Sequence, residues 1–157
     1  MLKKPENKTR KRLRITQCVF YLLQIFLCTF PVIRFPKPDE PGQYLHRTLF
    51  DMFGYMFSSY SDEAVASAFK VAIPFFLLLL IIPIVGFFFC AIDKERNLKN
   101  IVSVVCCLLG VFSTLTFIPI NMLGFGAILS LIFYIFISFI TTIAMMARLV
   151  DDSNTNK

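Results

Sequence analysis

Residues 71–92 read VAIPFFLLLLIIPIVGFFFCAI, and they contain no Asp, Glu, Lys or Arg. A helix that rises 1.5 Å per residue needs about 20 apolar residues to cross the ~30 Å hydrocarbon core of a bilayer. The stretch reaches this length, which predicts a membrane-spanning helix. Three more uncharged apolar runs come close to the same length, at residues 15–33, 101–120 and 127–147. The chain is therefore expected to be an all-α integral membrane protein with four transmembrane helices in an antiparallel bundle.

The composition excludes an ordinary soluble domain. Hydrophobic residues make up 57% of the 157-residue chain, the chain has 19 Phe, and the mean hydropathy is +0.71. A soluble domain of this length cannot bury so much apolar surface. All five cysteines lie within the apolar runs. A disulfide-bonded extracellular domain is therefore not expected, and neither is a metal site.

The Lys and Arg residues predict the orientation. Residues 1–14 form a basic leader with seven of them, and twelve of the sixteen lie on one side of the predicted membrane. Basic residues favour the cytoplasmic side, which places both termini in the cytoplasm and suggests the plasma membrane. The chain then divides into this leader, a single transmembrane domain at residues 15–150 and a short polar cytoplasmic tail at residues 151–157.

The basic leader also predicts which partners the cytoplasmic side attracts. Each basic residue near a membrane surface adds about 1 kcal/mol of attraction to anionic lipid. We therefore expect the leader to lie close to anionic lipid as well as to set the topology. Nucleic-acid binding is not expected, because no folded basic domain accompanies the leader.

The long loop between the first two predicted spans has an unusual pattern. It begins with RFPKPDEPGQ, residues 34–43, whose prolines favour an extended chain. Over residues 43–60 the apolar residues recur at helical spacing, which predicts an extracytoplasmic amphipathic helix at the membrane interface. Its apolar face is formed by Leu49, Phe53, Met56, Phe57 and Tyr60. Such a helix serves as a membrane-lying connector, or as a lid or docking surface for another membrane protein.

Small residues four positions apart predict how the spanning helices pack. In lipid, such residues let helix backbones approach closely. The candidate packing residues are Cys106, Gly110 and Thr114 in the third run, and Gly126, Ser130, Ser138 and Thr142 in the fourth. Gln24 is the deepest strongly polar residue of the first run. We expect it to face other helices, because an unpaired amide in hydrocarbon is costly.

The predicted spans lack the residues that membrane enzymes and proton-coupled transporters use. None of them contains an internal Asp, Glu, Lys, Arg or His. No enzyme activity and no cofactor are therefore expected. We expect a non-catalytic accessory or assembly subunit that binds another membrane protein, or itself, through helix packing. The alternative is a self-assembling pore, a holin-like channel or a small transporter.

The predicted topology is similar to that of claudin-like four-helix proteins, which also have cytoplasmic termini and a long first outer loop. Those proteins carry a Trp-containing motif and a Cys pair in that loop. This chain has no Trp, and its outer loop has no Cys. The similarity therefore ends at topology, and no family is assigned from the sequence.

Overall fold

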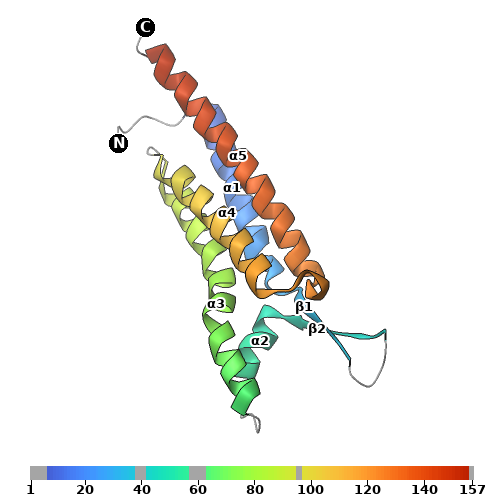
Figure 1. The fold of residues 1–157 in the computed structure, drawn as a ribbon. Helices are drawn as coiled ribbons and strands as arrows, with labels where there is room; N and C mark the ends of the chain where they lie inside the picture. Colours follow the sequence, from blue (N-terminus) through green and yellow to red (C-terminus); the bar gives the residue numbers. More distant parts are fainter. Residues whose placement is uncertain (1–6, 38–41, 57–62, 95–96, 156–157) are drawn as a thin grey trace.

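The computed structural model describes residues 7–37, 42–56, 63–94 and 97–155, and most of them are helical (Figure 1). In chain order the elements are α1 (Lys8–Leu27), β1 (Pro31–Pro36), β2 (Tyr44–Thr48), α2 (Leu49–Met56), α3 (Glu63–Ile92), α4 (Leu98–Phe117), the 3-10 turn η1 (Ile120–Met122) and α5 (Phe125–Thr155). Within these described ranges, three stretches are long and apolar enough to cross a membrane, at Pro74–Ile92, Leu98–Phe117 and Phe125–Val150. They fit an integral membrane protein.

The four long helices pack side by side (Figure 1). Helix α1 contacts α3 and α5, and α4 contacts the same two helices. The two strands and α2 lie together at one end, and we call these three elements the hairpin cap. The start of α1 and the end of α5 lie at the opposite end.

Helix α1 differs from the predicted first span at both ends. It begins at Lys8, where the Asn7 side chain accepts a hydrogen bond of 2.8 Å from the Arg10 N–H. It ends at Leu27, so the prediction of a helix to residue 33 was wrong. Pro31 lacks an N–H and disfavours helical geometry at the residue before it. Because α1 includes basic residues of the leader, it is not one of the three stretches described above.

The hairpin cap contains a two-stranded sheet, which the all-α prediction did not include. Strand β1 pairs with β2 in antiparallel register, with Arg34 opposite His46. On the other edge of β1, the Gly124 N–H donates a hydrogen bond of 2.8 Å to the Val32 carbonyl oxygen. The sheet is thereby attached to the connection between α4 and α5.

The amphipathic helix predicted at residues 43–60 is shorter in the structure. Residues 44–48 form β2, and the helix starts at Leu49. Thr48 caps it: its N–H donates to Asp51 Oδ2 at 2.8 Å, and its hydroxyl oxygen accepts from the Asp51 N–H at 3.1 Å. This reciprocal pair is a capping box.

The Thr48 N–H, which donates to the carboxylate, and then the nearby Thr48 hydroxyl hold the pKa of the Asp51 carboxyl below its usual value. A lowered pKa in the folded state means that the ionised carboxylate favours folding. The contribution is present above the pKa of the unfolded chain, and it is lost as the pH falls through the lowered pKa. The capping box thus stabilises the start of α2 at neutral pH.

The last two long helices are shifted from their predicted bounds. Helix α4 ends at Phe117 rather than at residue 120, because Pro119 cannot donate a backbone hydrogen bond. Helix α5 begins at Phe125 and continues to Thr155, beyond the predicted span of 127–147. The turn η1 between them is only three residues long. Helices α4 and α5 are therefore close neighbours.

Candidate functional site

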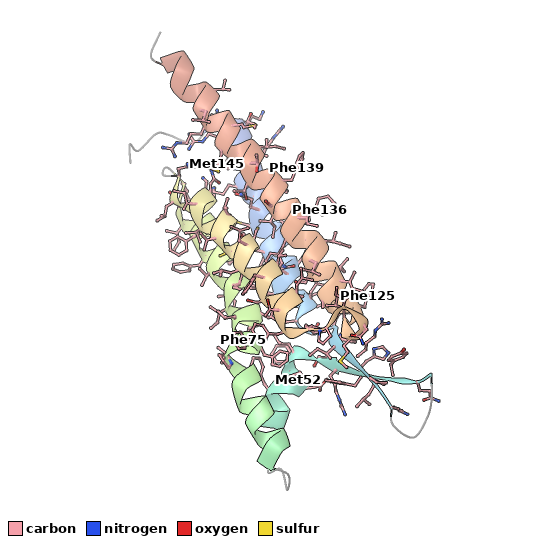
Figure 2. All side chains as sticks on the ribbon, in the orientation of Figure 1. Met52, Phe75, Phe125, Phe136, Phe139 and Met145 are labelled. Atoms are coloured by element: carbon pink, nitrogen blue, oxygen red, sulfur yellow. The ribbon has the colours of Figure 1, made fainter. Side chains whose placement is uncertain are left out.

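The face of α2 that contains Leu49 packs against its own chain. Leu49 is 1% exposed, Met52 is also buried, and Phe53 is half-buried against the same apolar cluster. We call this cluster the cap cluster, and it also includes Val32 of β1 and Phe76 of α3. Figure 2 shows Met52 close to α3. This face therefore covers the ends of the long helices, and Leu49 has almost no surface left for a partner.

The structure does not describe the side chains of three of the predicted interfacial residues. Met56 closes α2, but its side chain lies outside the described part of the structure. Phe57 and Tyr60 lie outside the described residues altogether. The described part of the amphipathic face is thus Leu49 to Phe53. Met52 was missed in the sequence, although its spacing of three residues from Leu49 is typical of a shared helix face.

Two buried tyrosines lie directly on glycines of neighbouring helices. Tyr21 of α1 covers Gly86 of α3, and Tyr134 of α5 covers Gly110 of α4. A Cβ atom placed on either glycine would overlap the ring that covers it. Gly110 was predicted as a packing residue and lies at such a contact. Gly86 was missed, although a glycine inside a long helix is itself a signal of close packing.

Buried polar groups connect the long helices. Gln17 Nε2 donates to Thr141 Oγ1 at 2.8 Å, which joins α1 to α5. Cys90 Sγ of α3 lies 3.9 Å from Gln17 Oε1 and 3.5 Å from Ser103 Oγ of α4. All four side chains are buried. Polar contacts of this kind orient helices where the hydrophobic effect cannot.

Gln24 makes a second polar contact between α1 and α5. Its Nε2 donates to the Ser130 carbonyl oxygen at 3.2 Å, and the side chain is 2% exposed. Gln24 Oε1 is buried and has no hydrogen-bond partner among the described residues. The predicted orientation of Gln24, toward other helices, agrees with this placement.

The other predicted packing residues fall into two groups. Cys106 and Thr114 are buried, and Gly126 is closely approached by the backbone of Leu27 and Pro31. Ser138 is half-buried and Thr142 is exposed. These last two residues do not lie in the tight contact between α4 and α5. They line an open groove instead.

This α4–α5 groove has a volume of about 770 Å³. Its floor contains Cys107 and Tyr134, which are buried. Its apolar walls are 64–67% exposed and consist of Leu108, Phe112, Ile135 and Phe139. Phe139 is visible along α5 in Figure 2. The lining residues that the structure describes include no charged side chain, and all of them lie within the stretches of the two helices that are long and apolar enough to cross a membrane.

Basic side chains gather at the end opposite the hairpin cap. Arg10, Lys99 and Arg148 are buried there. Arg14 Nη1 donates to the carbonyl oxygens of Cys90 and Ala91 at 3.4 and 3.5 Å, near the C-terminus of α3. A cation at a helix C-terminus interacts favourably with the helix dipole. These contacts give part of the basic cluster a structural role.

Among the residues that the structure describes, no group of three His, Cys, Asp or Glu side chains could hold a metal ion. No family model, no curated protein and no solved structure matches the chain. The groove, the hairpin cap and the buried polar contacts are the features from which a function can be inferred.

Proposed function

We propose that the protein is a non-catalytic multi-pass membrane subunit, and that it binds a transmembrane helix of another membrane protein in the α4–α5 groove. The groove is the observation that carries this proposal. It is open, about 770 Å³ in volume, and lies at the depth of the membrane-spanning stretches. Helix association in lipid depends on van der Waals packing. A concave apolar surface that is wide enough for a row of side chains provides such packing.

Small hydroxyl residues in the groove support a helix as the occupant. Ser138 and Thr142 are four positions apart on α5, which is the spacing that lets two helix backbones approach closely. The Thr142 hydroxyl donates to the Ser138 carbonyl oxygen at 3.0 Å, so it adds no unsatisfied donor to the contact. A partner helix can thus lie against α5 without leaving the Thr142 hydroxyl unpaired.

The shape of the groove argues against self-association through the same surface. A two-fold dimer would place the groove of one copy against the groove of the other. Two concave surfaces would leave both grooves unfilled, and unfilled space forfeits packing energy. The fitting partner is convex, as a single helix is.

The proposal includes an antiparallel arrangement of four membrane crossings with both termini in the cytoplasm. Helix α1 has 20 residues, which corresponds to about 30 Å at 1.5 Å per residue. Its basic first turns can reach the lipid headgroups, because Lys and Arg side chains extend toward the membrane surface. The polar contacts of Gln17 and Gln24 attach it to α5.

Charge supports the orientation. With this topology, twelve of the sixteen Lys and Arg residues lie on the cytoplasmic side. Only four lie on the other side. An excess of Lys and Arg in the cytoplasmic segments is typical of multi-pass membrane proteins. The hairpin cap then faces outward.

Labelling with a membrane-impermeant maleimide tests this topology. In a variant without its native cysteines, Gln43→Cys should react in intact cells, because Gln43 is exposed beside β2. Lys8→Cys, at the exposed start of α1, should react only after the cells are permeabilised. Reaction of Lys8→Cys in intact cells would reverse the proposed orientation.

A bulky residue in the groove tests the partner. Ser138→Trp should fill the groove and abolish recovery of a stoichiometric partner in mild detergent, as measured by quantitative mass spectrometry. Leu22→Trp is the matched control, because Leu22 is half exposed on α1 and lies outside the groove. It should leave the partner bound. Equal recovery with both variants would contradict docking in the groove.

A pore or small transporter is the second candidate, and the buried polar side chains of Gln17, Gln24, Ser103 and Thr141 favour it. The cavity beside Gln24 measures only about 20 Å³, so passage of a solute would require the helices to move apart. Flux of ions or small solutes into vesicles that contain the purified protein alone would favour this candidate. Absence of flux, together with a stoichiometric partner, would favour the subunit.

A further inference from the structure

A small cavity, partly open to the outside, lies where α1, α4 and α5 meet the hairpin cap. Its volume is about 20 Å³. Both polar residues and apolar residues of the cap line it. The lining includes Gln24, Thr114, Ser130, Val32, Leu49 and Ala127.

Gln24 presents an unsatisfied acceptor at this cavity. Its Oε1 atom is buried and has no hydrogen-bond partner among the described residues. The orientation of the amide follows from its other atom, since Nε2 donates to the Ser130 carbonyl oxygen at 3.2 Å. Reversing the amide would place two oxygens against each other. Oε1 therefore needs a donor, and buried polar groups normally have one.

We propose that one water molecule occupies this cavity and donates a hydrogen bond to Gln24 Oε1. A cavity needs roughly 10–15 Å³ of probe-occupied volume to hold a water. The volume of about 20 Å³ is enough for one water and too small for a chain of them. The proposal does not depend on the groove or on the partner helix.

The neighbouring hydroxyls complete the hydrogen bonds that a buried water makes. Such a water usually has two to four polar partners. The Thr114 hydroxyl already donates to the Gly110 carbonyl oxygen at 2.8 Å, so toward the water it can only accept. The Ser130 hydroxyl can donate or accept. Gln24, Thr114 and Ser130 together offer the water three partners.

The chemistry of the cavity selects a neutral ligand. None of the described residues that line it is charged. A metal cation of the calcium or magnesium type requires about six oxygen ligands, which this lining does not provide. Burial of an uncompensated charge among Val32, Leu49 and Ala127 would be costly. Water satisfies Oε1 without that cost.

A structure of the full chain in lipid nanodiscs, at a resolution that shows ordered solvent, tests the proposal. We expect one solvent peak within about 2.7–3.2 Å of Gln24 Oε1. The peak should be the same in sodium, potassium and choline chloride. Absence of a peak would overturn the proposal, and so would a peak that appears only with sodium, because it would identify a cation.

Gln24→Met provides a second measurement, because methionine has a similar length and no amide. We expect loss of the peak. A peak that remains in the Gln24→Met structure would show that Gln24 does not hold the water, and it would overturn the assignment. If this variant does not fold, the comparison of the three salts in the parent protein still shows whether a water molecule or a cation occupies the cavity.

Discussion

Gly110→Leu should destabilise the protein by about 3 kcal/mol, since added volume in a well-packed interior costs about 1–3 kcal/mol and occasionally more. The Tyr134 ring occupies the position that a Cβ atom at residue 110 would need. Tyr134 is 1% exposed, so its ring has little room to move away. The free energy of unfolding, measured by denaturant titration in mixed micelles, provides the comparison with the parent.

A smaller substitution allows a matched control. Gly110→Ala should also destabilise, although alanine normally favours a helix by about 1 kcal/mol relative to glycine. Gly54→Ala in α2 should be neutral or stabilising, because no atom of the described residues lies within 4 Å of a Cβ placed there. In a double-mutant cycle, Tyr134→Ala should reduce the cost of Gly110→Ala. If Gly110→Ala and Gly54→Ala had the same free energy of unfolding, the contact between Tyr134 and Gly110 would be contradicted.

Leu49→Asp should lower the free energy of unfolding by at least about 3 kcal/mol, because it removes a buried leucine and introduces a carboxylate into an apolar cluster. Leu49 is 1% exposed and contributes to the cap cluster. The measurement is again denaturant titration, combined with protease sensitivity of the hairpin cap. We expect the cap to become sensitive while the long helices remain protected.

The neighbouring residue is the control for this prediction. Phe50 lies on the same helix and is 53% exposed. Phe50→Asp should change stability much less than Leu49→Asp, because the new carboxylate is not forced into the cluster. If both variants were equally stable, α2 would not be attached to the long helices through Leu49. In that case its apolar face would be available to lipid or to a partner.

The sequence predicted the long apolar helices, but hydropathy alone misplaced the end of the first. The apolar run continues through Pro31, Val32 and Ile33, which belong to β1. Pro31 was the available signal, since it disfavours helix at the preceding residue. The basic residues of the leader were assigned to a separate segment, whereas α1 begins at Lys8. The helix therefore extends into the leader at one end, and hydropathy misplaced its other end.

The hairpin cap was harder to predict, because its pairing is not local. The spacing of Leu49 and Phe53 correctly indicated an amphipathic helix, but amphipathicity does not identify the surface on which the helix packs. Residues 44–48 became a strand because β1 is placed beside them. That pairing depends on the end of α1, which the sequence pattern had misplaced.

The packing residues show a similar limit. A row of small residues indicates that something approaches closely, but it does not say whether the neighbour belongs to the same chain. Gly110 lies against Tyr134 of its own chain, whereas Ser138 and Thr142 line the open groove. The α4–α5 groove depends on the relative placement of two helices. The spacing of residues within one helix does not indicate how the two helices are placed.

The hydrogen bond between Gln17 and Thr141 has a consequence for biosynthesis. The two residues are 124 positions apart, so at a synthesis rate of about 5–20 residues per second the ribosome adds Thr141 roughly 6–25 s after Gln17. Gln24 likewise waits for Ser130, which follows it by 106 positions. In the proposed topology, α1 carries during this interval two amides that hydrocarbon does not satisfy. With that topology, α1 reaches its final place in the membrane only when α5 arrives.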